Sequence, residues 1–449
     1  MNAYIYLIIG CIMCSDYIVA SFDLPSMLHF IPEVLSIGLI GYVFIEGTRT
    51  RFQLIAPKYW IIFAALIVVI ICGVVNGQDG SGPIITGMRF YLRALPMFFV
   101  AAIMPLSDEQ LRKQLKVLLA IGLIQLPFAA YQRWTIIEAN RFSGDDVRGT
   151  VMDSGILSMY LISGVLILVG MLLKRRIGKL WFTILFFLLL LPTTINETKV
   201  TVILLPVGLM VVLIAGAEAG KRLKYTALTL IALIGFGAIF VPVYDMLEEH
   251  NHYKVKLLDF FTSEEQLDKY LIAHGRNRGT GIGGTKLSGR GDSIMVPLVY
   301  LARDPVTLAF GLGVGNVSPS NLGKNFEGGY FRLFRSVLIT SFTYFVLEIG
   351  LLGLGLIGLM FWLMFLDSQV VARRDDSLRG ALASGWTGVI AIFGICIFYN
   401  VFYQFPSVSY LFWYYMGLIC ARRVALQMND ATATRHVSAA AYPKALPQS

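Results

Sequence analysis

Long apolar runs separated by short basic connectors dominate the chain. Each run is about 20 residues long, the length that an α-helix needs to cross a hydrocarbon core of about 30 Å. Because a backbone in lipid must satisfy its own hydrogen bonds, continuous apolar runs of this length predict helices rather than barrel strands. The expected spans are 3–21, 28–46, 59–76, 88–105, 115–133, 154–173, 179–195, 199–217, 224–243, 344–367, 382–403 and 406–421.

The composition agrees with a membrane protein. Of the 449 residues, 56% are hydrophobic and 14% are charged, and the mean hydropathy is +0.70. A soluble domain carries roughly 25% charged residues. We therefore expect one all-α, polytopic membrane domain of about 12 spans over 1–423. The remainder, 424–449, has few large apolar side chains and is expected to be a disordered cytoplasmic tail.

The basic residues indicate how the spans are oriented. Short clusters of lysine and arginine follow the even-numbered spans. The positive-inside rule places such connectors in the cytoplasm, so both termini are expected there. The net charge of +9 then reflects topology rather than nucleic-acid binding. The clusters are Arg49, Arg51 and Lys58; Arg112, Lys113 and Lys116; Lys174, Arg175, Arg176 and Lys179; Lys221, Arg222 and Lys224; Arg373, Arg374 and Arg379; and Arg422 and Arg423.

Two connectors on the opposite side are longer than a turn, 134–153 and 244–343. The second is expected to open as a helix and then contains the glycine- and arginine-rich stretch GRNRGTGIGGTKLSGRGDS. Glycine lets backbone amides approach a ligand closely, and guanidinium groups bind phosphate oxygens in a bidentate way. Two interpretations stay open: a site for a lipid-linked phosphate, and flexible loops whose arginines meet lipid headgroups. The arginines concerned are Arg141, Arg148, Arg276, Arg278 and Arg290.

Several ionisable residues lie within apolar runs or at their edges, and four of them are considered as site residues. Arg89 and Arg93 are spaced i,i+4 and therefore share one helix face. Lys199 is the first residue of the eighth span, at its outer end, and Glu348 lies inside the tenth span. Intramembrane ionisable groups are costly and usually face a cavity. These four are therefore candidate site residues, with snorkelling to the interface as the alternative for Arg89 and Lys199.

Two weaker patterns do not support a site. Gly279, Gly281 and Gly284 fit a dinucleotide-binding motif, but no strand–helix unit surrounds them, so we discard it. The pair Asp145–Asp146 could bind a divalent metal, but it fits a solvated acidic turn better. Neither pattern predicts a metal or a cofactor.

Four segments carry motifs of one family. RGTVMDSGILSMYL at 148–161 looks like an Arg-Gly-Thr that precedes a membrane helix, and NETKVTVILLPVGL at 196–209 stands where a Ser-Arg-Gly is common. SGRGDSIMVPLVYLARDPVTLAFGLGVGN at 288–316 combines Gly-Arg before a helix, Asp-Pro, and a Gly-x-Gly-x-Gly turn. YFVLEIGLLGLGLIGL at 344–359 looks like Glu-x-Gly-Leu-x-Gly at a helix start. Over about 130–365 the chain thus resembles the bacterial O-antigen polymerase and ligase superfamily, which includes the Wzy-type polysaccharide polymerases.

The resemblance implies the all-helical fold shared with C-type glycosyltransferases, in the bacterial inner membrane. The implied reaction moves a glycan from undecaprenyl diphosphate to a sugar hydroxyl at the periplasmic face, with no cofactor and no obligatory metal. Arg148 and Arg290 match the arginines that engage the lipid diphosphate, where fixed positive charge beside a leaving group lowers the barrier. By position, Arg93, Lys199 and Arg335 are second-tier candidates, and Lys199 stands at a family arginine.

One departure from the family bears on the reaction. Ligases of the family generally carry a histidine late in the large loop, but 331–345 has none, and His274 precedes Arg290. This departure favours a polymerase over a ligase. It also leaves the general base open among His274, Asp292 and Glu348.

We therefore predict a polymerase of undecaprenyl-diphosphate-linked repeat units that makes a surface polysaccharide or exopolysaccharide. The implied partners are the lipid-linked donor and acceptor, membrane lipids and, as a candidate, a chain-length-regulating membrane protein; nucleic acid is not among them. A ligase is the nearest alternative. A transporter of the same lipid-linked sugars would be expected to expose charged residues to both membrane faces, and a scaffold would not explain the arginine–glycine composition.

Overall fold

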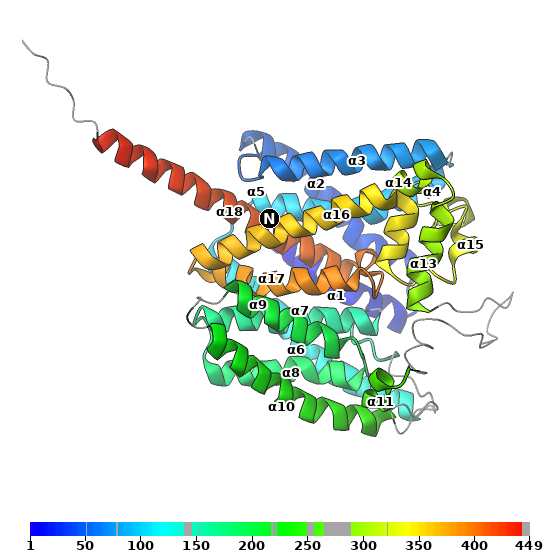
Figure 1. The fold of residues 1–449 in the computed structure, drawn as a ribbon, viewed down its shortest axis with the longest axis horizontal. Helices are drawn as coiled ribbons and strands as arrows, with labels where there is room; N and C mark the ends of the chain where they lie inside the picture. Colours follow the sequence, from blue (N-terminus) through cyan, green and yellow to red (C-terminus); the bar gives the residue numbers. More distant parts are fainter. Residues whose placement is uncertain are drawn as a thin grey trace, which may run out of the picture.

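The computed structural model is a helical bundle (Figure 1). It describes residues 1–50, 52–77, 80–138, 146–151, 153–216, 220, 222–248, 256–264, 289–320 and 322–441, and these ranges contain no strand. The α-helices are α1 (Asn2–Ser21), α2 (Ile31–Arg49), α3 (Pro57–Gly77), α4 (Ser81–Leu92), α5 (Leu95–Ile103), α6 (Asp108–Glu138), α7 (Ser154–Leu173), α8 (Lys179–Ile195), α9 (Thr201–Gly216), α10 (Arg222–Glu248), α11 (Leu257–Thr262), α13 (Arg290–Leu301), α14 (Pro305–Phe310), α15 (Phe331–Phe334), α16 (Ser341–Arg374), α17 (Leu378–Cys396) and α18 (Pro406–Ala441). Short 3-10 helices are η1 (Ser26–Phe30), η4 (Lys324–Phe326) and η5 (Phe402–Gln404).

The helices confirm an all-α architecture in the described residues and are compatible with a membrane-embedded protein. Within the described residues, 8 helices are long and apolar enough to cross a membrane, and α8, α9 and the Leu233–Met246 part of α10 are apolar but shorter. Each predicted span coincides with a helix or, for 88–105, with the pair α4 and α5. That all of these segments cross the bilayer stays a prediction.

The predicted boundaries are wrong at several helices, and local chemistry explains why. The span predicted at 88–105 is two helices, since Pro96 near the start of α5 has no N–H to donate and its ring obstructs the preceding turn. The prediction placed the start of α6 at 115, but the helix begins at Asp108. Its first turns carry charged as well as apolar residues, so a search for continuous apolar runs leaves them out. The segment 382–403 ends its α-helix at Cys396, after which the chain turns into η5. Helix α6 also continues to Glu138 and α10 to Glu248, which shortens both long connectors.

The C-terminal segment also differs from the expectation. Helix α18 continues to Ala441, so residues 424–441 of the expected disordered tail are helical. Alanine has the highest helix propensity of the residues, and this stretch is rich in alanine. Residues 442–449 lie outside the described part.

Helix α17 lies at the centre of the bundle, packed against α7, α9 and α16. Glycines bring α7 and α17 into backbone contact. A Cβ on Gly170 would lie 2.3 Å from the carbonyl oxygen of Ala381, and a Cβ on Gly385 would lie 2.5 Å from that of Leu166. Small residues at such contacts are the usual means of close helix packing in membranes.

Residues 367–379, where α16 passes into α17, gather the basic clusters at one end of the molecule, which we call the basic end. The contacts pair Asp367 with Lys58 and Arg423, Asp375 with Arg422, Asp376 with Lys174, Arg379 with Asp108, and Arg373 with the carbonyl of Ala215. The even-numbered spans therefore end together, as the predicted alternation requires. In Figure 1 this end lies to the left, and α13, α14 and α15 cover the right-hand end, the loop end. The cytoplasmic placement of the basic end stays a prediction.

Candidate functional site

The segment 146–150, which carries Arg148, is fixed by two glutamines of α6. The side-chain oxygen of Gln132 accepts hydrogen bonds from the backbone N–H groups of Arg148 (2.9 Å) and Gly149 (2.8 Å), and its Nε2 donates to the Gly149 carbonyl (2.7 Å). Gln125 binds Thr150 in the same way, accepting from its N–H at 2.8 Å and donating to its hydroxyl at 2.9 Å. The Arg148 guanidinium lies at the exposed surface, 3.1 Å from Asp146. The backbone is thus held in place while the guanidinium stays accessible.

Replacing Gln132 by methionine removes these three hydrogen bonds and keeps the side chain's size. Because a net hydrogen bond contributes about 0.5–1.5 kcal/mol, we expect amide exchange at Arg148 and Gly149 to become at least about tenfold faster. Hydrogen exchange with mass spectrometry of the peptide over 146–151 measures this. Gln110→Met, on the same helix at the basic end, is the matched control; equal exchange in both variants would contradict the prediction.

The start of α7 connects this segment to the end of α17. Asp153 caps α7 by accepting from the N–H of Ile156 at 2.9 Å, and the same carboxylate oxygen accepts from the Asn400 side chain at 2.9 Å. The Asn400 carbonyl in turn accepts from the N–H and hydroxyl of Ser341, the first residue of α16. The turn after α17 therefore joins the starts of α7 and α16.

Arg290 lies on the other side of the same turn. It begins α13, where the N–H of Gly289 donates to the carboxylate of Asp292 at 3.1 Å. The Arg290 guanidinium stacks over the ring of Tyr399, 4.5 Å from its centroid. That ring also lies 3.6 Å from the position of a Cβ on Gly155, in the first turn of α7. Tyr399 thus contacts both segments that carry the predicted motif arginines, although they are far apart in the sequence.

The turn with Lys199 adjoins the same place. Its Asn196 donates to the Ser154 carbonyl at 3.0 Å and to the Ser158 hydroxyl at 3.1 Å, which fixes the turn against the start of α7. Lys199 itself is half-buried. The neighbouring Glu197 forms a buried ion pair with Arg133 of α6 at 2.5 Å. The loop end therefore gathers Lys199 and the segment of Arg148 into one layer of polar contacts.

Arg89 and Arg93 do share one face of the α4 region, as their spacing predicts, and both bind Glu33 of α2. The Arg93 guanidinium lies 2.6 Å from the Glu33 carboxylate and also donates to the Gln404 carbonyl, and Arg89 donates to Glu33 at 2.8 Å. Arg89 also stacks on Phe30, 4.4 Å from the ring centroid. Two cations, with side chains 19% (Arg89) and 6% (Arg93) exposed, share one carboxylate, which leaves a local charge of +1.

Glu348 lies under the glycine turn of the second motif. Its side chain is fully buried and accepts a hydrogen bond from the Ser318 hydroxyl at 2.7 Å. A Cβ on Gly311 would lie 2.5 Å from the carbonyl carbon of Glu348, and the N–H of Leu312 donates to the Leu347 carbonyl at 2.7 Å. This geometry supports an anchoring role for Glu348; its catalytic role stays a prediction.

The Asp-Pro of the same motif has a local explanation. Asp304 caps α14, accepting from the N–H of Thr307 at 2.9 Å, with Pro305 at the first helical position. The hydrogen bonds from the Thr307 hydroxyl and N–H hold the pKa of Asp304 below its usual range. We therefore assign Asp304 to helix capping.

Of the remaining predicted site residues, the structure describes Arg335. Arg335 follows α15 and is exposed. Within the described ranges, no group of three or more His, Cys, Asp or Glu side chains could hold a metal ion. Arg141, His274, Arg276, Arg278 and the glycine-rich stretch 275–288 lie outside the described residues, as does Asp145.

Sequence reasoning missed Gln125, Gln132, Arg133, Tyr399 and Asn400. The first three are polar residues in an otherwise apolar run, a signal that could have marked this face of α6.

A search of family models with this sequence found no match, and a search of curated proteins found none either. The residues that meet at Tyr399 are therefore the basis of the functional proposal.

Proposed function

We propose that the chain is a metal-independent glycosyltransferase, similar in architecture to the C-type enzymes, that polymerises undecaprenyl-diphosphate-linked oligosaccharide repeat units at the periplasmic face of the bacterial inner membrane. The observation that carries this proposal is the convergence of the two predicted diphosphate-binding segments on Tyr399. Arg290 stacks on its ring, and the start of α7, six residues after Arg148, lies against it.

The charges at the loop end suit a diphosphate. Guanidinium groups bind phosphate oxygens through two parallel hydrogen bonds, and they stay protonated at any physiological pH. Arg148 is exposed and Arg290 is half-buried, so each has a surface that faces outwards. Lys199, in the adjoining turn, adds a third cation. Fixed cations placed where a diphosphate leaves would stabilise the negative charge that develops on it.

The proposed reaction is a substitution at the anomeric carbon of the donor glycan. The acceptor hydroxyl oxygen bonds to that carbon, the bond from the carbon to the diphosphate oxygen breaks, and the hydroxyl proton passes to a carboxylate. Of the three candidate bases, Asp292 is described, partly exposed and two residues from Arg290, whereas Glu348 is fully buried. We therefore assign the base to Asp292, whose carboxylate also receives the N–H of Gly289.

The test is polymerisation by the purified protein in nanodiscs, with an undecaprenyl-diphosphate-linked repeat unit as the only substrate and a gel ladder as the readout. Arg148→Ala and Arg290→Ala are each expected to lower the rate by about 100-fold or more, the usual loss when a donor to a developing charge is removed. Asp292→Asn is expected to abolish the ladder. Arg332→Ala is the matched control, because Arg332 lies at the same end but is exposed and pairs with Glu327 at 3.5 Å.

Each other result leads to a different assignment. Transfer only after a lipid or protein acceptor is added would replace the polymerase with a ligase. Movement of the lipid-linked sugar across the bilayer without transfer would replace the enzyme with a transporter. Equal rates in Arg290→Ala and Arg332→Ala, with unchanged melting temperatures, would refute the role of the motif arginines.

A further inference from the structure

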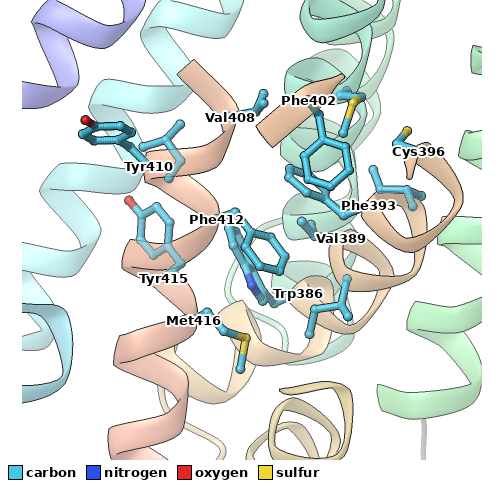
Figure 2. Packing of buried hydrophobic residues seen from close by; sticks show 14 of the residues in the cluster. Trp386, Val389, Phe393, Cys396, Phe402, Val408, Tyr410, Phe412, Tyr415 and Met416 are labelled. Atoms are coloured by element: carbon cyan, nitrogen blue, oxygen red, sulfur yellow. The ribbon is translucent and has the colours of Figure 1, made fainter. Parts of the chain in front are cut away.

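A cavity of about 510 Å³ opens at the basic end, and its lining reaches into the bundle as far as Tyr160, within the motif segment 148–161. It lies between α6, α7, α8, α17 and α18, and its size falls in the range of about 300–1,000 Å³ that is usual for ligand pockets. Its wall is mainly apolar. Figure 2 shows the part contributed by α17 and α18, where Trp386 and Phe393 face Phe412.

The rim of this cavity carries four cations. Arg112 and Lys116 come from the start of α6, and Arg175 and Arg176 from the turn after α7. Arg176 donates to the carbonyl of Asp376, while the other three form no ion pair with any residue in the part of the chain that the structure describes. An apolar hollow with a basic rim is complementary to a molecule with an apolar chain and an anionic head.

The depth of the cavity corresponds to one leaflet. Along α7 its lining extends from Tyr160 to Met171, which is about 16 Å at a rise of about 1.5 Å per residue. This is about half of a hydrocarbon core of about 30 Å, with the cations at the headgroup level. An acyl chain of a lipid in the same leaflet therefore fits along the cavity.

We propose that this cavity binds an anionic glycerophospholipid, with its phosphate at Arg112, Lys116, Arg175 and Arg176 and one acyl chain along the apolar wall. A polyprenyl phosphate shares the phosphate and an apolar chain, and comparative binding distinguishes the two. Basic pockets between membrane helices are established binding places for anionic lipid headgroups. The basic rim lies at the opposite end of the bundle from Arg148 and Arg290, and the proposal does not depend on the proposed enzymatic function.

The test is lipid binding by the delipidated full chain in detergent, measured by native mass spectrometry and by the rise in melting temperature. The probes are phosphatidylglycerol, phosphatidylcholine and undecaprenyl phosphate. Phosphatidylglycerol is expected to bind most tightly. Arg175→Gln and Lys116→Gln are each expected to weaken it roughly fivefold, whereas Lys179→Gln, on the same end but outside the cavity, leaves it unchanged.

A further variant tests the interior. Gly164 faces the cavity, where a Cβ would meet only Leu189 at 3.4 Å, so Gly164→Leu is expected to fill the space and abolish binding. Equal binding of phosphatidylcholine, or no effect of the rim variants, would overturn the anionic site. Tighter binding of undecaprenyl phosphate than of phosphatidylglycerol would replace the phospholipid with a polyprenyl lipid.

Discussion

Replacing Glu33 by alanine is expected to lower the free energy of unfolding by about 3–5 kcal/mol, the usual cost of leaving a buried charge without its partner. Glu33 accepts from both Arg89 and Arg93, and the Arg93 side chain is only 6% exposed. Without this carboxylate, two cations face each other in an apolar setting. Thermal and denaturant unfolding in detergent measures the loss.

Glu46→Ala is the matched control for this prediction. Glu46 lies on the same helix and pairs with Arg49 at 3.6 Å, but the Arg49 side chain is 79% exposed. Exposed pairs of this kind contribute about 0–1 kcal/mol. Equal losses in the two variants would show that the cluster around Glu33 is solvated and contributes little to stability.

The second large effect is expected for Gly350→Ala in α16. Gly350 has φ 65° and ψ −172°, a conformation that is open almost only to glycine, and a Cβ there would lie 2.3 Å from the carbonyl oxygen of Ala309. Backbone strain of about 1–3 kcal/mol and steric overlap of about 1–3 kcal/mol together predict a loss of about 2–6 kcal/mol. We expect little folded protein, measured by size-exclusion chromatography and thermal unfolding.

The same helix offers the control for this substitution. A Cβ on Gly355 would have nothing within 4 Å, and its backbone is helical. Since alanine is favoured over glycine within helices by about 0.5–1 kcal/mol, Gly355→Ala is expected to leave stability unchanged or to raise it slightly. A melting temperature for Gly350→Ala that matches this control would contradict the steric explanation.

The sequence predicted those features of the fold that depend on neighbouring residues. Apolar run length predicted where the helices of the bundle lie, and the i,i+4 spacing correctly placed Arg89 and Arg93 on one face. The pairing with Glu33 was not predictable, because Glu33 lies 56 residues before Arg89 and no local pattern shows which helices become neighbours. The kink at Gly350 depends in the same way on the distant backbone of Ala309, which no local pattern reports.

The candidate site shows the same limit. The motif at 148–161 predicted that Arg148 precedes a membrane helix, and α7 begins at Ser154. The glutamines that hold Arg148 in place come from α6, and the aromatic ring that receives Arg290 follows α17. Such contacts depend on which helices are neighbours in the bundle, and hydrophobic patterns carry no information on neighbours.

The ion pairs of residues 367–379 at the basic end have a consequence for the order in which the protein is assembled during synthesis. Lys58 and Lys174 find their carboxylates on Asp367 and Asp376, hundreds of residues later in the chain. A ribosome delivers these carboxylates only after most of the membrane segments have already been made. The early helices are therefore inserted with their basic ends exposed to water and headgroups. The bundle is complete only after α16 has been synthesised.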